Sequence, residues 1–403
     1  MSLKGLKVKI DKSNSTVKII ESPDIISDLL IPPSVELNNK NYPFSLIREN
    51  SFLNNQNIKS ITFTNDSQLQ IIGKSAFANS SLSKIIIPPS VIEMGEYVFN
   101  LCKKLIEVDF LPESKLQVLP KNSFYFTSIS KIVVPQSIKK ICDFAFAHCD
   151  KLISIEFHPN SQLETIGSYA FSDCSIDHIS IPLSVEIIDN FAFSHCRRLK
   201  NVEFSENSKL TKINKYTFFL CFLKTIKIPS KVSSIENFSF SLCDSLKVVD
   251  FYPNSELQTI GSDSFAGLDI VKITIPSKVK LIESKAFSQC KKLKEIIISD
   301  DSLLEKIGSS SFIETSLSRV VCPKRVKSID KNAFRECVHL RTVELLGNEI
   351  KLDYMSFCNS ISLIVFSCPN AAKIEMNKEA FHNVSNEFSF FTFPHSKIYK
   401  RNL

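Results

Sequence analysis

One phenylalanine recurs at regular spacing through most of this sequence, and the spacing constrains the fold more than any other feature. The distance between successive members alternates strictly between 25 and 22 residues. A repeat period of roughly 20 to 50 residues indicates a solenoid, in which each coil is covered only by its neighbours. We call these residues the anchor phenylalanines: Phe52, Phe77, Phe99, Phe124, Phe146, Phe171, Phe193, Phe218, Phe240, Phe265, Phe287, Phe312 and Phe334.

Each repeat carries a short apolar alternation, such as Ile155-Glu-Phe157 or Ile179-Ser-Ile181. An alternation of period two predicts a strand with one buried face. A second apolar pair follows before the next anchor, for example Leu163 and Ile166. Because these positions recur once per coil, we expect the strands to stack into one continuous parallel sheet, with the anchor rings as an internal spine.

The two repeat lengths differ at the turn that follows the strand. In the 22-residue coils a proline comes directly after the strand, where its missing amide hydrogen favours an end over a middle. The 25-residue coils have polar turn residues there instead, as in residues 158–161. The prolines of the short coils are Pro88, Pro135, Pro182, Pro229, Pro276 and Pro323.

The twelve cysteines follow the same period. Most of them stand three residues after an anchor, where other coils have Asn55, Ser80, Thr127, Leu268 or Thr315. A free cysteine packs as a small buried residue with a weak donor. No C-x-x-C pair or zinc-type Cys/His spacing occurs. We therefore predict buried structural thiols, reduced or shielded from oxidants, at Cys102, Cys149, Cys174, Cys196, Cys221, Cys243, Cys290 and Cys337.

The best copies of the repeat, LSKIIIPPSVIEMGEYVF (residues 82–99) and IDHISIPLSVEIIDNFAF (residues 176–193), resemble the BspA-like leucine-rich repeat family. The resemblance extends over about residues 28–381. It implies a repeat solenoid that forms a curved right-handed superhelix with a parallel β-sheet on the concave face. Short strands, turns or helical turns would line the convex face.

Both ends depart from the regular spacing. Residues 6–20 alternate around a Ser/Asn turn and predict a hairpin, and after Phe334 the steps to Phe357 and Phe381 become 23 and 24. Terminal repeats of solenoids are commonly atypical, because they must close the core to water. We expect one continuous domain with a capping hairpin at residues 1–27, regular repeats at 28–345, and irregular last repeats with a C-terminal cap at 346–403.

Charged residues flank the apolar centre of many predicted strands. The 25-residue coils mostly place an acid after the centre, and the 22-residue coils mostly place a base before it. One interpretation is a charge-patterned concave surface that binds a partner. The other is that neighbouring strands neutralise one another and keep the sheet solvated. The candidate partner-binding residues are Lys84, Asp109, Lys131, Glu156, Glu203, Lys227, Asp250, Lys272, Arg319 and Glu344.

Composition and motif searches exclude several functions. The chain has 49 basic and 42 acidic residues, and the excess of +7 forms no evident basic stripe, so no nucleic-acid binding is expected. No apolar window is long enough to span a membrane. No G-x-S-x-G, Walker A, G-x-G-x-x-G or H-E-x-x-H motif occurs, and the seven histidines are scattered. We predict a non-enzymatic protein without cofactor or metal.

Family resemblance favours adhesion to an extracellular matrix or host surface protein, because members are commonly surface or secreted proteins of oral bacteria and mucosal parasites. That implies a cell-surface or secreted location and a surface antigen. The N-terminal residues lack the apolar core of a signal peptide, and no anchor is visible. A cytoplasmic protein-interaction scaffold is therefore the alternative.

Overall fold

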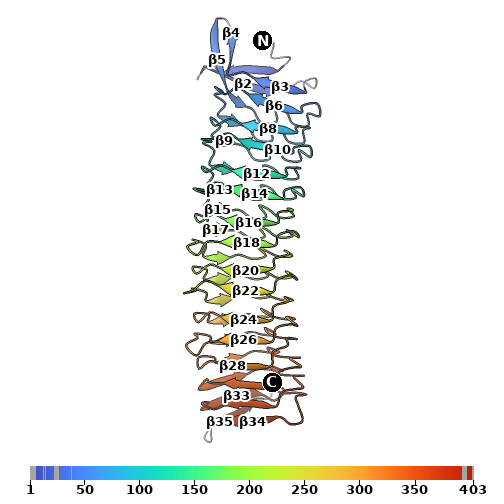
Figure 1. Ribbon diagram of the computed structural model, residues 1–403, viewed down its shortest axis with the longest axis vertical. Coiled ribbons are helices and arrows are strands. Elements are labelled where there is room, and N and C mark those ends of the chain that lie inside the picture. The colour runs from blue at the N-terminus through green and yellow to red at the C-terminus, as the bar shows by residue number, and fades with distance from the viewer. Residues whose placement is uncertain are drawn as a thin grey trace. The chain divides into compact units, whose positions relative to one another are not determined.

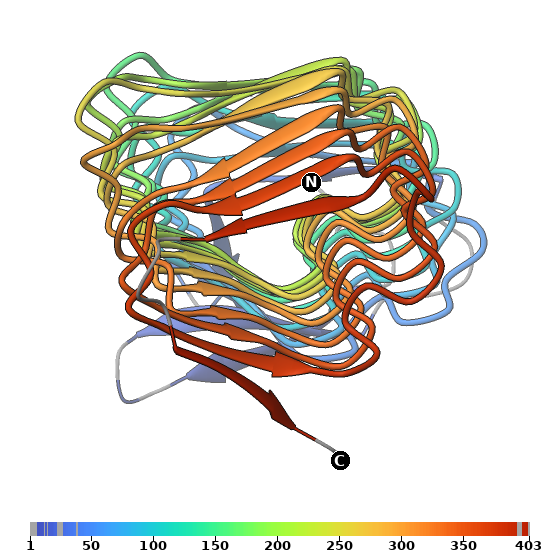
Figure 2. The same ribbon diagram turned by 90° about the horizontal axis from the view of Figure 1, so that it is seen from below.

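The computed structural model describes residues 6–11, 13, 15–21, 27–37, 39–392 and 397–401. The chain divides into two compact units, residues 1–199 (unit 1) and 200–403 (unit 2). Both units are parallel β-solenoids, in which successive coils stack as Figure 1 shows. A coil carries one strand on each of two opposite faces, which are visible along the stack in Figure 2. We call them the long-strand face, with strands of four residues, and the short-strand face, with strands that are mostly two residues long.

Unit 1 begins with the antiparallel hairpin of β1 (Lys7–Asp11) and β2 (Thr16–Glu21), as expected over residues 6–20, followed by a second antiparallel pair, β4 (Ser34–Leu37) and β5 (Lys40–Ile47). Its long-strand face contains β3 (Asp28–Ile31), β6 (Ser60–Phe63), β8 (Lys84–Ile87), β10 (Glu107–Phe110), β12 (Lys131–Val134), β14 (Ser154–Phe157) and β16 (His178–Ile181). Its short-strand face contains β7 (Ile71–Ile72), β9 (Glu93–Met94), β11 (Val118–Leu119), β13 (Lys140–Ile141), β15 (Thr165–Ile166) and β17 (Ile187–Ile188).

Unit 2 repeats this arrangement. Its long-strand face contains β18 (Asn201–Phe204), β20 (Thr225–Ile228), β22 (Val248–Phe251), β24 (Lys272–Ile275), β26 (Glu295–Ile298), β28 (Arg319–Cys322), β30 (Thr342–Leu345), β32 (Val365–Cys368) and β34 (Ser389–Thr392). Its short-strand face contains β19 (Lys212–Ile213), β21 (Ser234–Ile235), β23 (Thr259–Ile260), β25 (Leu281–Ile282), β27 (Lys306–Ile307), β29 (Ser328–Ile329), β31 (Glu349–Leu352), β33 (Lys373–Asn377) and β35 (Lys397–Arg401).

The anchor phenylalanines form the spine that the sequence predicts. Within each unit the rings stack coil on coil, with centroids 5.0–5.4 Å apart and nearly parallel planes. The rings of Phe52 to Phe193 and Phe218 to Phe334 are almost fully buried. Offset-stacked aromatic pairs contribute about 0.5–1.5 kcal/mol beyond the burial of their area. Each ring therefore holds its own coil against two neighbours.

The cysteines three residues after the anchors are free and buried, as expected. The structure adds the reason for their recurrence: seven of the eight thiols donate a hydrogen bond to the carbonyl oxygen of the preceding coil's anchor, as Cys196 does to Phe171 at 3.0 Å. Ser360 takes the same role towards Phe334 at 2.8 Å. Burial raises the pKa of the Cys196 thiol to about 12. These thiols are therefore protonated donors that satisfy buried carbonyls.

The expectation of one continuous sheet on the long-strand face is wrong. In the regular coils between β10 and β28, strands pair from a 22-residue coil to the next 25-residue coil, as β12 with β14, but β14 does not pair with β16, nor β22 with β24. Outside this stretch, β3, β6, β8 and β10 of unit 1 form one four-stranded sheet, and β28, β30, β32 and β34 of unit 2 form another. At each break, proline removes one hydrogen bond of the ladder. In the long coil the residue after the strand donates its amide to the preceding strand, as Tyr252 does to Ile228 at 3.0 Å. In the short coil that residue is proline, such as Pro182 or Pro276, which has no amide hydrogen to donate.

Helical turns, one of the structures expected opposite the sheet, are absent from the described residues, and short strands and turns occupy that side. The turn around each anchor explains why. The residues two before and two after an anchor have left-handed backbone, as Phe144 (φ 55°) and His148 (φ 58°) do around Phe146. A left-handed residue costs roughly 1–2 kcal/mol and interrupts a right-handed helix. Stacking helps to offset this cost, since Phe144 stacks on Tyr169 at 4.8 Å and Tyr169 on Phe191 at 4.5 Å.

We predict that Phe240→Ala lowers the free energy of unfolding by about 3–5 kcal/mol, because it leaves a cavity between the stacked rings of Phe218 and Phe265. Phe222→Ala is the matched control, because this ring is 52% exposed in the same unit. Urea unfolding followed by circular dichroism measures both variants. Equal shifts in the two midpoints would contradict a stabilising spine.

We also predict that Cys243→Ala destabilises by about 1–3 kcal/mol, because it removes the donor to the buried Phe218 carbonyl at 3.0 Å. Cys243→Ser should cost less, because a hydroxyl can donate to the same oxygen. The comparison of the two unfolding midpoints is the measurement. If serine is no better than alanine, the thiol contributes by packing alone.

Candidate functional site

The ten residues that the sequence singled out all lie on the long-strand face. Each is the first or third residue of its strand, and strand alternation points these two positions away from the core. Eight of the ten are exposed, while Lys84 and Glu344 are half-buried. The second residue of most of these strands is buried, as Val108 and Ile155 are. The repeat therefore presents two outward columns of side chains along each unit.

In unit 1 the bases of the first column are paired with acids of the next strand. The Lys84 ammonium lies 2.5 Å from the Glu107 carboxylate directly across the β8–β10 ladder. Lys131 contacts Glu156 at 2.7 Å on a diagonal across β12 and β14. Exposed pairs of this kind contribute roughly 0–1 kcal/mol. Their effect is to fix the positions of charges on the surface.

Unit 2 repeats the pairing. Lys272 contacts Glu295 at 3.1 Å across the ladder, and Arg319 contacts Glu344 at 3.4 Å on the diagonal. Lys227 stands opposite Asp250 in the ladder, with its ammonium 4.1 Å from the centre of the Tyr252 ring. The Tyr252 hydroxyl donates to the Phe204 carbonyl at 2.9 Å, which holds the ring in place.

Sequence reasoning missed Glu107, Glu295 and Tyr252. It compared only the position after the strand centre in the 25-residue coils, whereas Glu107 and Glu295 occupy the first position of their strands. An acid two residues before Asp109 or Ile297 is the signal that could have revealed them. Tyr252 lies just beyond its strand, and only the stacked coils bring its ring under Lys227.

Two neighbouring carboxyls on β10 titrate differently. The hydrogen bond from Lys84 lowers the pKa of Glu107. Partial burial, followed by the hydrogen bond with Glu107, raises the pKa of Asp109. The two residues are first and third on one strand, so their side chains share the outward face. The Lys84 ammonium therefore stabilises the ionised form of Glu107, whereas partial burial disfavours the ionised form of Asp109.

Apolar side chains stand between these charges. Val133 lies on β12, directly opposite Glu156 of β14, and is 51% exposed. Leu30 is exposed on β3. In unit 2, Val248 and Phe391 are exposed on β22 and β34. Protein interfaces combine apolar contact area with a polar, charged rim. The long-strand face offers both within a few side chains.

Pockets open where proline interrupts the ladder. In unit 1 a pocket of about 530 Å³ lies beside Pro135, between the turn after β10 and the turn after β12. In unit 2 a pocket of about 420 Å³ lies at the equivalent place beside Pro276, between β22 and β24. Both are open hollows at the ends of the strands. They follow directly from the missing proline amide.

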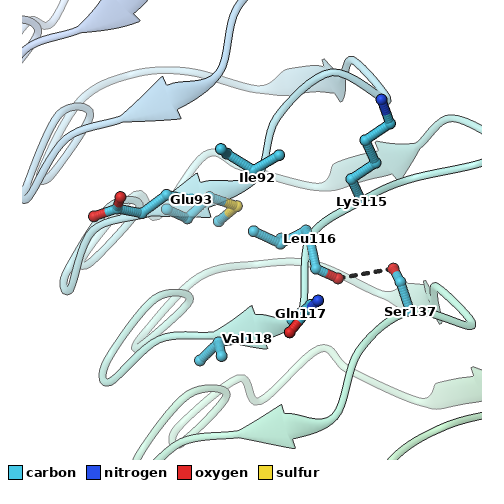
Figure 3. Close-up of a pocket in the computed structure, with 8 residues that line it drawn as sticks. Ile92, Glu93, Lys115, Leu116, Gln117, Val118 and Ser137 are labelled. Carbon is cyan, nitrogen blue, oxygen red and sulfur yellow. Dashed lines mark hydrogen bonds between the residues drawn. The ribbon is translucent and has the colours of Figure 1, made fainter.

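A third hollow lies on the short-strand face of unit 1, where β9 and β11 do not pair. Pro120 follows β11, whereas Gly95 and Cys142 at the corresponding positions donate amides to Ile72 and Leu119. Figure 3 shows this pocket of about 630 Å³, with apolar Ile92, Leu116 and Val118 along it and the Ser137 hydroxyl bonded to the Leu116 carbonyl at 2.8 Å.

Neither metal-type clusters nor membrane spans are found in the part of the chain that the structure describes. No three His, Cys, Asp or Glu side chains there are grouped closely enough to hold a metal ion. The same residues include no helix that could cross a bilayer.

Comparison with known proteins gives the class of the fold. The sequence matches the family described as BspA type leucine-rich repeat region over residues 34–152, 117–221, 211–341 and 305–401. These matches extend over most of the chain, which therefore belongs to this family. The fold is that of a protein-binding repeat. No curated protein sequence matches.

The first two of the following solved structures support the fold. A leucine-rich repeat protein from Bacteroides ovatus is 22% identical with a TM-score of 0.67, and the alignment covers 100% of both chains. The pneumococcal vaccine antigen PcpA is 18% identical with a TM-score of 0.50, covering 100% of this chain and 98% of PcpA. A leucine-rich cell surface protein from Faecalibacterium prausnitzii is 18% identical with a TM-score of 0.49, covering 98% and 95%.

We predict that Glu107 titrates below the ordinary range for a glutamate and Asp109 above that for an aspartate. Lys84→Ala should raise the pKa of Glu107, since its charged hydrogen-bond partner is lost. A raised pKa in the folded state means that Asp109 disfavours folding once it is ionised, so Asp109→Asn should not lower stability at pH 7. Carboxyl NMR titration measures both pKa values; a Glu107 pKa above the ordinary glutamate range, or an Asp109 pKa below the ordinary aspartate range, would contradict the assigned pairing.

Proposed function

We propose that this protein is a non-enzymatic adhesion module whose long-strand face binds an extracellular matrix or host surface protein. The observation that carries the proposal is the exposure of apolar side chains on that face, with Val133 as the clearest case. Val133 is the third residue of β12, and the fold does not require an apolar residue at this position, because Asp109 and Glu156 are the third residues of the neighbouring strands β10 and β14.

The pattern of charges supports protein recognition by this face. The ion pairs Lys131–Glu156 and Arg319–Glu344 hold both partners at defined positions on a rigid sheet. Such charges make binding of a partner with the complementary charge pattern more specific and its association faster. All ten residues singled out from the sequence belong to this proposed surface.

Membership of the BspA type family supports an extracellular role for this surface. The Faecalibacterium prausnitzii relative is named a cell surface protein, and PcpA is named a vaccine antigen. We therefore place the protein at the cell surface or among secreted proteins in this proposal.

The second candidate is an intracellular protein-interaction scaffold, and the free thiols favour it. All twelve cysteines are free, and Cys142 is only half-buried. Disulfides are rare and free thiols common in reducing compartments. The same long-strand face would then bind an intracellular protein.

We predict that Val133→Asp weakens binding to the matrix protein found by screening a panel of purified matrix proteins, by roughly tenfold or more, because a charge would be buried without a partner. Ile187→Asp is the matched control: Ile187 is 48% exposed, close to Val133, but lies on the short-strand face of the same unit. Surface plasmon resonance provides the affinities. Equal losses in both variants would remove the long-strand face as the site.

We predict that antibodies label intact cells as strongly as permeabilised cells. Labelling that needs permeabilisation would reject adhesion and leave the scaffold role.

A further inference from the structure

The basic excess of this protein is confined to one unit. Unit 1 contains 20 basic and 20 acidic residues, so its net charge is zero, while unit 2 contains 29 basic and 22 acidic residues. The whole excess of +7 therefore belongs to unit 2. Along the sequence the excess of basic residues looks scattered, because the lysines that the fold brings together are more than twenty positions apart.

Stacking collects part of this excess into one column. Lys200, Lys224 and Lys247 each stand directly before a strand of the long-strand face, at the N-terminal edge of the sheet. Their backbones are bonded coil to coil, since the Lys224 amide donates to the Lys200 carbonyl at 3.1 Å and the Lys247 amide to the Lys224 carbonyl at 3.0 Å. The three side chains therefore repeat at about 4.8 Å, one coil apart.

The column continues in the following coils of unit 2. Val271, Lys294, Ser318 and Arg341 occupy the same position, and the amides of Lys294, Ser318 and Arg341 donate to Val271, Lys294 and Ser318. Five of the seven side chains from Lys200 to Arg341 are cationic and exposed. We call Lys200, Lys224, Lys247, Lys294 and Arg341 the lysine column. It extends over about 29 Å.

These cations are not neutralised by the protein. In the part of unit 2 that the structure describes, no ion pair involves any member of the lysine column. Nearby acids have other partners, as Asp269 has in Lys292 at 2.6 Å and Glu295 in Lys272. Exposed like charges one coil apart repel one another.

The fold does not require lysine at this position. In unit 1 the equivalent residues are Lys59, Ser83, Ile106, Ser130, Ile153 and Asp177, of which one is basic and one acidic. The backbone bonds are the same there, as the Ile106 amide donates to the Ser83 carbonyl at 3.0 Å. Coil stacking therefore does not account for a column of one charge in one unit alone, since the coils stack in the same way without it.

We propose that the lysine column binds a linear sulfated polysaccharide that runs along the coil edge of unit 2. A row of single point charges, each on a flexible stem, suits anionic groups distributed along an extended chain. Single-stranded nucleic acid is the less suitable polyanion, because its bases need a series of aromatic platforms. Among the described residues beside this column, only Phe222, two residues before Lys224, exposes an aromatic ring. This surface is distinct from the outward columns of the long-strand face.

The test compares three immobilised probes: dextran sulfate, uncharged dextran, and an oligothymidylate. The full chain should bind dextran sulfate at about 0.1 M salt and lose it at about 1 M, where the screening length falls from about 10 Å to about 3 Å. Uncharged dextran should not bind. Equal binding of uncharged dextran, or tighter binding of the oligothymidylate, would overturn the proposal.

Two triple variants locate the site. Lys200→Gln, Lys224→Gln and Lys247→Gln together should weaken dextran sulfate binding roughly 10- to 100-fold. The control carries Lys212→Gln, Lys231→Gln and Lys280→Gln, which remove the same charge from exposed lysines of unit 2 outside the column. The control should bind almost as the unchanged chain does. Equal losses in both variants would mean that net charge alone attracts the polymer, and would overturn the site.

A second variant guards against misfolding of the first. Lys294→Gln with Arg341→Gln shortens the same column from its other end and should weaken binding several-fold, with an unchanged circular dichroism spectrum. Full retention of binding in this double variant would restrict the site to the three lysines and contradict a column-long ligand.

Discussion

Coil-to-coil stacking is the interaction on which the rest of this structure depends. No coil has a core of its own, and the ring of one anchor is buried only because the anchors before and after it lie at about 5 Å. The thiol ladder follows from the same stacking, because each donor reaches the carbonyl of the coil before it. A solenoid of this kind adds stability one interface at a time, so surface residues are free to vary along it. The contrast between Ile106 or Ser130 in unit 1 and Lys224 in unit 2 shows that freedom.

Proline acts as a second constraint, and it shapes the surface more than the core. The prolines leave the core unchanged: Ile181 and Ile275, which directly precede Pro182 and Pro276, remain buried. What the missing amide removes is the ladder bond to the preceding coil. Between β10 and β28 the long-strand face is consequently divided into strand pairs, and hollows open beside Pro135 and Pro276. The single proline at position 120 produces the same effect on the short-strand face.

The candidate surface was predictable in its location and only partly in its pairing. Alternation within each strand was enough to point Lys131 and Glu156 outward. Whether a lysine meets an acid directly across the ladder, as Lys84 meets Glu107, or on a diagonal, as Lys131 meets Glu156, depends on register and side-chain reach. The lysine column lay outside the sequence analysis for a similar reason. Its members follow the coil period, but each stands in the irregular segment just before a strand, where no alternation marks it.

The amino-acid sequence by itself determined the solenoid, the coil lengths, the anchor spine and the small-donor position, because each of these depends on a period that can be counted along one chain. The tertiary structure decided what lies between coils. It determined that Cys196 serves the Phe171 carbonyl, that the ladder breaks after every second strand in the regular coils between β10 and β28, and that left-handed residues around each anchor replace helical turns. It also brought Lys200, Lys224 and Lys247 into one column. The physical reason is that hydrogen bonds and charges act over a few ångströms in space, and stacking places residues more than twenty positions apart within that distance.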